Sequence, residues 1–266
     1  MSAQFIFHTY NCRKLRVSAF LGNTSRNGEH DYTHNSMSDI QVALAEFHNG
    51  KLIFKKEGFC TISPGKYFEI SEENCPLIAP DDKDYTLVAY CNRQQDKKYF
   101  PQEHQLTISR QGSPISTSLI YDQMPTSSKS KSIILLAPKV WISNDVNTII
   151  SFANSSYLNE DLKETSWEFS FITGSGRIIH TLRKNLKQNN TFLLNIKEAL
   201  FGIVKLTDKL EMINVVARGE SSACVILTLL QNEKTGAIAL EHSLSPHYYM
   251  NGDFDKVRKE AFLFLD

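Results

Sequence analysis

The sequence lacks a net charge, because its 29 basic residues are balanced by 29 acidic residues. Nucleic-acid binding draws on clustered lysine and arginine side chains, so this balance predicts a protein that does not bind nucleic acid. The chain also lacks an apolar run long enough to span a membrane, and residues 1–8 lack the apolar core of a signal peptide. We therefore expect a soluble, cytoplasmic protein with no membrane partner.

Cysteine is scarce and follows no pattern. The five cysteines are Cys12, Cys60, Cys75, Cys91 and Cys224. No two of them have the C-x-x-C spacing of zinc or redox sites, and only one lies in the second half of the chain. We expect free, mostly buried thiols in a reducing compartment.

The sequence motifs of common enzymes are missing as well. The chain contains no G-x-S-x-G, no H-E-x-x-H, no phosphate-binding loop and no dinucleotide fingerprint. Residues 219–223 resemble a nucleophile elbow only in composition, because no helical segment follows them. These absences favour a non-catalytic protein that needs no cofactor.

The chain does contain one pattern twice. Gly50-Lys51-Leu52-Ile53 is echoed by Gly176-Arg177-Ile178-Ile179 and, with no gap, Phe68-Glu69-Ile70 falls on Leu194-Asn195-Ile196. Further echoes pair Asn23 with Asn154, Leu87-Val88-Ala89 with Val215-Val216-Ala217, and Leu119 with Leu240. The spacing drifts from 121 (Leu119 to Leu240) to 131 (Asn23 to Asn154), as loop insertions in a tandem copy would produce. The pattern predicts a duplicated unit.

Short alternating runs between turn residues predict an all-β fold. Residues 39–47 alternate polar and apolar side chains, and Asn49-Gly50 then favours a tight turn into the next strand. Each half holds roughly six to eight such runs, which is typical of a β-sandwich or a small barrel. We therefore expect two tandem, duplicated β-sandwich (or small barrel) domains.

Composition also predicts where these domains begin and end. The small and cationic residues 126–132 indicate a linker between a first unit of residues 1–125 and a second of residues 133–266. Near the C-terminus, Phe254, Val257 and Ala261 fall on one face of a helix. We expect a short C-terminal helix that packs on a sheet.

The best candidate site lies near the end of the second unit. Its residues are Glu241, His242, His247, Tyr248 and Tyr249. Histidine can act as a base, an acid or a ligand near neutral pH, and adjacent tyrosines form a flat surface that stacks on a sugar or a partner side chain. We expect a binding site for a carbohydrate or a protein, while the oligomeric state stays open.

Comparison of the copies sharpens this candidate. Where the second copy has Glu241-His242, the first has Ile120-Tyr121, so the second unit carries an additional titratable pair. Neighbours on a strand point to opposite faces, and the period of Ile238, Leu240 and His242 favours His242 as the side chain that faces the site. The other interpretation is an ordinary strand end with a structural histidine.

Residues 44–70 contain Gly50, then Ser63-Pro64-Gly65, then a strand. This order resembles the glycine turn and the later Pro-Gly turn of cupin barrels. The resemblance implies a metal-dependent, bicupin-like enzyme, in which His30, His34 and Glu46 would hold a divalent metal in the first unit. The spacing of these three residues departs from the cupin pattern, and His104 matches its last histidine only loosely. A solvated polar loop is the other interpretation of residues 28–34.

Overall fold

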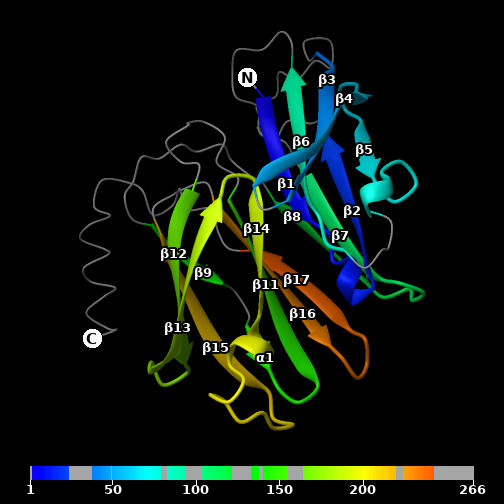
Figure 1. The fold of residues 1–266 in the computed structure, drawn as a ribbon. Coiled ribbons are helices and arrows are strands. Elements are labelled where there is room, and N and C mark those ends of the chain that lie inside the picture. Colours follow the sequence, from blue (N-terminus) through cyan, green and yellow to red (C-terminus); the bar gives the residue numbers. More distant parts are fainter. Residues whose placement is uncertain are drawn as a thin grey trace, which may run out of the picture. The chain divides into compact units, whose positions relative to one another are not determined.

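The structure, a computed structural model, describes residues 2–23, 38–48, 50–78, 83–93, 104–121, 133–137, 140–154, 164–219 and 224–242. The chain divides into two compact units, residues 1–125 and 126–266. Nearly all regular structure in the described residues is β-strand (Figure 1), which confirms the predicted all-β fold. Within these residues, no helix has the length and apolar content needed to cross a membrane. The predicted linker and C-terminal helix lie outside the described residues.

The first unit is a sandwich of two antiparallel sheets. Its described strands are β1 (Ser2–His8), β2 (Leu15–Gly22), β3 (Ile40–His48), β4 (Lys51–Ile62), β5 (Tyr67–Ile70), β6 (Thr86–Arg93), β7 (His104–Arg110) and β8 (Ser116–Tyr121). One sheet has the order β1-β6-β3-β4 and the other has the order β5-β2-β7-β8. Apolar side chains such as Phe5, Leu44 and Leu106 are fully buried, because alternate residues of each strand face the core.

The second unit repeats this topology. Its described elements are β9 (Ile133–Ala137), β10 (Trp141–Ile142), β11 (Val146–Asn154), β12 (Glu164–Thr173), β13 (Ile178–Lys187), β14 (Asn190–Asn195), α1 (Ile196–Ala199), β15 (Glu211–Gly219), β16 (Cys224–Asn232) and β17 (Ile238–His242). One sheet has the order β10-β15-β12-β13, with β9 also on β15, and the other has the order β14-β11-β16-β17. With β9 and β10 in the place of β1, the strand orders of the units agree throughout. The predicted duplication is therefore confirmed at the level of topology.

The register of the paired strands shows which residues of the units correspond. The predicted alignment pairs Leu87 with Val215. Leu87 lies opposite Glu46 and Val215 lies opposite Phe171, so Glu46 and Phe171 also occupy corresponding positions. Close to the turn of each β-hairpin the register shifts by one residue, at Ile53 in β4 and at Ile179 in β13. Both copies therefore carry the same one-residue bulge at an isoleucine.

One part of the predicted alignment is wrong. The β3–β4 ladder shifts by two further residues between Val42 and Leu44, whereas the β12–β13 ladder is regular at that level. Beyond this point the correspondence is displaced by two residues, so Ile70 corresponds to Leu194 and not to Ile196. The ungapped comparison could not show this displacement, because the two extra residues lie inside a strand.

The same buried asparagine closes each sandwich. Asn23 and Asn154 stand at the ends of β2 and β11, and both are 0% exposed. The Asn23 side-chain amide donates to the carbonyl of Ile62 (2.8 Å) at the end of β4, and that of Asn154 donates to the carbonyl of Leu186 (3.3 Å) in β13. Each asparagine thereby ties the end of one sheet to the other sheet.

The backbone of each asparagine is held in the same way. The Asn23 carbonyl accepts from Gly65 N–H (2.8 Å) and the Asn154 carbonyl accepts from Asn189 N–H (2.9 Å). Gly65 and Asn189 have φ angles of 71° and 54°, a left-handed conformation that glycine and asparagine adopt most readily. Turn chemistry and side-chain bonding therefore agree at both corresponding corners.

Candidate functional site

An open depression of about 320 Å³ lies on the first unit's β3, β4 and β6. Its lining residues are Gln41, Val42 and Ala43 from β3, Lys55, Glu57 and Gly58 from β4, and Tyr90 and Asn92 from β6. Val42 is fully buried and faces the core, so alternation places Gln41 and Ala43 on the outer face of this sheet. Tyr90 lies opposite Ala43 and Asn92 opposite Gln41, which puts all four side chains on that outer face.

The two-residue shift in the β3–β4 ladder creates the depression. Val42 pairs with Cys60 and Leu44 pairs with Lys56, so three residues of β4 span the length of one residue of β3. Gly58 lies in this stretch with a φ of 59°, and a Cβ placed on it would meet nothing within 4 Å. The widened ladder and the missing side chain together leave the space open.

Polar side chains around the depression are held in place by their neighbours. The Gln41 Oε1 accepts from the Thr61 hydroxyl (2.9 Å), a bond that does not use the two N–H donors of the Gln41 amide. Lys55 Nζ lies 5.5 Å from the centre of the Tyr90 ring and forms an ion pair with Glu57. The site therefore combines side-chain amides, an aromatic ring and a compensated pair of charges.

The Cys60 thiol, on the strand that carries Gly58, is not a reactive nucleophile at neutral pH. Burial raises the pKa of Cys60, in β4, to about 12. A thiol with this pKa is protonated at neutral pH, and the thiolate is the reactive form. All five cysteines are free in the structure.

The corresponding face of the second unit has different chemistry. Ser166 takes the place of Gln41, and Glu168 takes the place of Ala43. Glu168 forms an ion pair (2.8 Å) with Arg183, which lies opposite it on β13. Because the β12–β13 ladder is regular here, it lacks the widening that opens the depression in the first unit.

Two of the predicted site residues lie on β17. His242 lies opposite Leu227 and Glu241 lies opposite Thr228 on β16. Leu227 is buried outside the main core of the second unit, so His242 lies on the outer face of its sheet and Glu241 on the inner face. Both side chains are partly buried. The two side chains therefore do not converge on one side of the strand.

The register also corrects the comparison of copies at this strand. Ala19 and Ile150 are equivalent positions. In the first unit Ala19 lies opposite Leu106, which lies opposite Leu119. In the second unit Ile150 lies opposite Thr228, which lies opposite Glu241. Glu241 therefore corresponds to Leu119, and His242 to Ile120, one residue from the predicted alignment. The other predicted ligand-binding residues, His247, Tyr248 and Tyr249, lie outside the described residues.

The alternative metal site has only one member in the described structure. Glu46 is buried on β3, whereas His30 and His34 lie outside the described residues. His104 is enclosed in the core, with its ring 4.4 Å from that of Phe5. Within the described residues, no cluster of three histidine, cysteine or carboxylate side chains could hold a metal ion. The metal-dependent interpretation stays a prediction.

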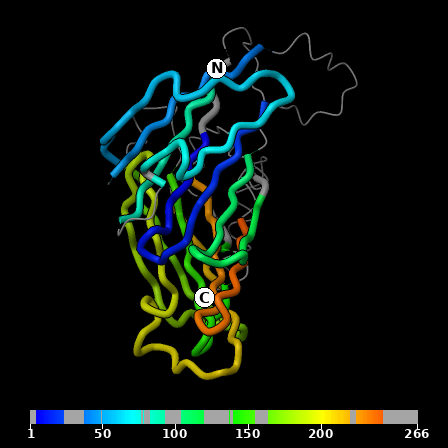
Figure 2. Tube along the Cα trace, turned by 90° about the vertical axis from the view of Figure 1, so that its right-hand side faces the viewer, coloured from blue at the N-terminus to red at the C-terminus, as the bar shows by residue number. Residues whose placement is uncertain are grey.

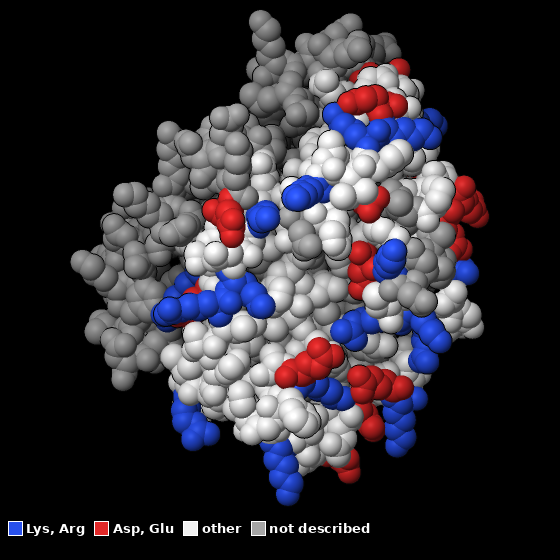
Figure 3. Space-filling view, in the orientation of Figure 1, with Lys and Arg blue, Asp and Glu red and all other residues white. Residues whose placement is uncertain are grey.

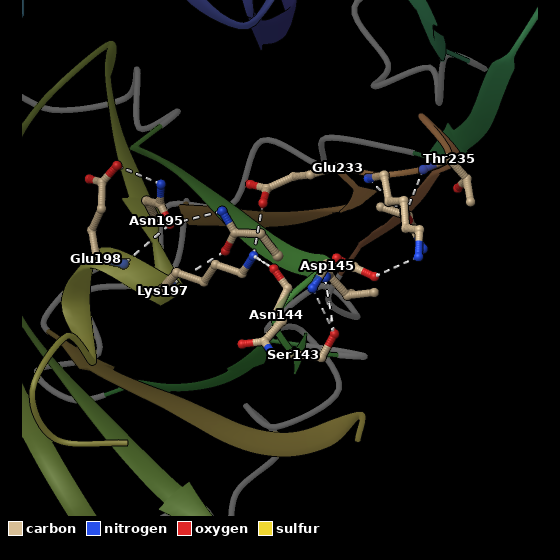
Figure 4. A network of polar contacts seen from close by, with 12 residues as sticks. Ser143, Asn144, Asp145, Asn195, Lys197, Glu198, Glu233 and Thr235 are labelled. Atoms are coloured by element: carbon tan, nitrogen blue, oxygen red, sulfur yellow. Dashed lines mark hydrogen bonds and ion pairs between the residues drawn. The ribbon is translucent and has the colours of Figure 1, made fainter. Parts of the chain in front are cut away.

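A second polar cluster lies at one end of the second unit, where residues 143–145, 195–198 and 233–235 meet (Figure 4). Lys197 Nζ donates to the carbonyl of Asn144 (2.7 Å) and to the Glu233 carboxylate (2.8 Å). Asn195 donates to Glu198 (2.7 Å) and caps α1 by accepting from its backbone N–H. These groups satisfy one another, so the cluster acts as a structural clamp between loops.

Exposed apolar side chains gather at two places. Leu52, Ile53 and Phe54 are exposed along β4, the edge strand of its sheet. Phe201 is 88% exposed in residues 200–210, the yellow segment that extends from one end of the second unit in Figures 1 and 2. On the face shown in Figure 3, described basic and acidic side chains are interspersed, so neither sign forms a broad patch there.

Sequence reasoning missed the depression. Tyr90 and Asn92 alternate with buried residues on β6, but that pattern is common to every half-exposed strand. The available signal was Gly58 inside an otherwise strand-like run, because an isolated glycine in a strand suggests a bulge.

No family model matches this chain, and no curated protein matches it. Among solved structures, a β-glucuronidase from Bacteroides uniformis is 12% identical, with 92% of this chain and 26% of that chain covered and a TM-score of 0.19. A glycosyl hydrolase family 2 member from Bacteroides cellulosilyticus is 7% identical, with 91% and 28% covered and a TM-score of 0.20. The chain spans about a quarter of the length of these proteins, and TM-scores this low carry no inference about its fold or function.

Proposed function

We propose that this chain is a non-catalytic binding protein whose first unit binds a carbohydrate in the β3–β4–β6 depression. The observation that supports this most is the two-residue widening at Gly58, which opens a polar recess on the outer face of the sheet. Three hydrogen-bonded strands carry the recess, so its side chains are arranged before a ligand arrives. Binding sites of this kind need a few fixed polar groups around a preformed concavity.

The residue types suit a sugar. Carboxamides such as Gln41 and Asn92 can donate to and accept from hydroxyl groups, and the Tyr90 ring offers an apolar surface for a sugar face. Glycoside hydrolysis generally uses two carboxyl groups on either side of the bond. The depression has one carboxylate in its lining, Glu57, and that group is paired with Lys55. This supports binding without hydrolysis.

A glycan array followed by calorimetric titration tests the proposal. Gln41→Ala and Asn92→Ala should each weaken binding of the best glycan about tenfold, because each removes hydrogen bonds to the ligand. Ser166→Ala, at the position that corresponds to Gln41 in the second unit, should leave the affinity unchanged. Absence of binding across the array, or equal losses in Gln41→Ala and Ser166→Ala, would overturn the assignment.

A protein ligand is the second candidate, favoured by the exposed apolar strip on β4. Such a strip on an edge strand is a common place for a partner segment to dock. The double variant Leu52→Ser/Phe54→Ser separates the two functions. It should leave glycan affinity unchanged if the ligand is a carbohydrate in the depression.

A further inference from the structure

The first unit buries two imidazole rings, one of them where the second unit has an apolar side chain. His104 on β7 is 2% exposed and stands opposite Leu21, just as Ile226 on β16 stands opposite Phe152. His8 on β1 is 8% exposed. In the described part of the second unit, the histidines are only partly buried. The described parts of the two units therefore differ in their number of buried histidines.

Both rings sit in surroundings that suit the neutral form. Within the described structure, His104 Nδ1 and His8 Nε2 have no hydrogen-bond partner. The His104 ring packs on Phe5, while His8 Nδ1 lies 3.2 Å from the Thr86 hydroxyl. Burial lowers the pKa of each histidine from 6.5 to about 3.

Few buried titratable groups accompany these two rings among the first unit's described residues. Tyr10 meets the His8 ring edge-on at 5.7 Å. Among the first unit's described residues, the buried carboxylate is that of Glu46, which lies opposite Leu87. The buried thiols of the same residues are those of Cys75 and Cys91. Burial is the cause that lowers the pKa of both His8 and His104.

We propose that His8 and His104 form an acid-sensitive opening device in the first unit, which has no counterpart among the described residues of the second unit. When the first unit opens, both rings become hydrated and bind protons as ordinary histidines do. Between about pH 6.5 and pH 3 the open form therefore binds more protons than the closed form. The stability of the first unit is complete above this window and is lost progressively as the pH falls through it.

The expected effect is large over a narrow range. From pH 7 to pH 5, protonation of an exposed histidine raises the opening equilibrium constant about 25-fold, and two histidines raise it roughly 600-fold. The opening of the first unit does not depend on a ligand, so its test does not depend on the outcome of the carbohydrate-binding test.

Two buried cysteines report the opening of each unit within the full chain. Cys91 on β6 and Cys224 on β16 are almost fully buried, one in each unit. Pulsed labelling with dithiodipyridine, read by peptide mass spectrometry, gives the ratio of their labelling rates. That ratio cancels the pH dependence of the reagent.

The Cys91-to-Cys224 labelling ratio should rise several hundredfold from pH 7 to pH 5. His104→Leu should reduce the rise to about 25-fold, and His48→Gln, at an exposed hairpin position, should retain all of it. His8→Gln should reduce the rise equally and replaces His104→Leu as the test if that variant does not fold. A ratio that stays constant with pH, or a full rise in the variants of both buried histidines, overturns the proposal.

Discussion

At one equivalent cross-strand pair, the two units divide the core volume differently between the two side chains. In the second unit the Trp167 ring packs against Gly219, the residue opposite it on β15, and a Cβ on Gly219 would lie 2.2 Å from that ring. In the first unit the corresponding pair is Val42 and Cys91, and both are fully buried. The packing of the sheets fixes the total volume available to such a cross-strand pair, but different pairs of side chains can fill that volume.

The units also differ in regularity. The second unit has a β12–β13 ladder that is regular beyond its hairpin bulge, and an aromatic core in which Phe152 and Phe169 pack edge-on at 5.1 Å. The first unit has the widened ladder at Gly58 and two buried histidines. Departures from regular packing are expected where a fold carries function, so the comparison directs attention to the first unit.

Replacing either member of the Trp167–Gly219 pair by its counterpart from the first unit should have the largest effect on stability. Trp167→Val should lower the free energy of unfolding by about 3–5 kcal/mol, because it empties a large core position. Gly219→Cys should lower it by about 3 kcal/mol, because its side chain collides with the ring. Urea unfolding followed by circular dichroism measures both.

The double variant tests whether the two positions share one volume. Trp167→Val/Gly219→Cys installs the first unit's pair and should lose clearly less than the sum of the single losses. Strictly additive losses would show that the two positions do not exchange volume.

Removing the corner asparagines compares the units at an equivalent contact. Asn23→Ala and Asn154→Ala should each lower the free energy of unfolding by about 2 kcal/mol, since each removes the buried side-chain hydrogen bonds that the asparagine donates. Asn23→Ala should lose more, because its bonds (2.8 and 3.1 Å) are shorter than those of Asn154 (3.3 and 3.5 Å). The exposed Asn185→Ala is the control, and the reverse order of losses would contradict the equivalence.

The loop clamp should stabilise the second unit by a similar or smaller amount. The Lys197 side chain is 15% exposed, so Lys197→Met should lower the free energy of unfolding by about 1–2 kcal/mol. Tryptophan fluorescence reports this unit specifically, because Trp141 and Trp167 both lie within it.

Lys234→Met is the matched control for the clamp. Lys234 is 76% exposed and 4.0 Å from Asp145, so its loss should change the free energy of unfolding by less than about 0.5 kcal/mol. Similar effects of the two lysine variants would show that the clamp is an ordinary surface contact.

The smallest expected effect concerns the widened ladder. Gly58→Ala should destabilise the first unit by about 1 kcal/mol, because its φ of 59° is unfavourable for a side chain although the space is open. Gly174→Ala in the second unit's hairpin has equally open space without that φ and should change the thermal midpoint little. Equal midpoints for the two variants would mean that the widened ladder relaxes without strain.

Local pattern predicted most of the strands within a few residues. The alternation over residues 39–47 corresponds to β3, which spans Ile40–His48. The strand expected from Lys51 extends to Ile62, beyond the charged residues and Gly58 at which its apolar pattern fails. In that stretch the strand is stabilised by hydrogen bonds to β3, and a contribution from a separate strand is not visible in the local composition.

The sequence by itself determined the strands, the turns and the duplication, because period-two alternation and turn chemistry are local properties of the chain. Only the tertiary structure decided the two-residue displacement, the gathering of Gln41, Tyr90 and Asn92 on one face, and the burial of His8 and His104. These features depend on the register between strands distant in sequence, and packing of the whole sandwich sets that register.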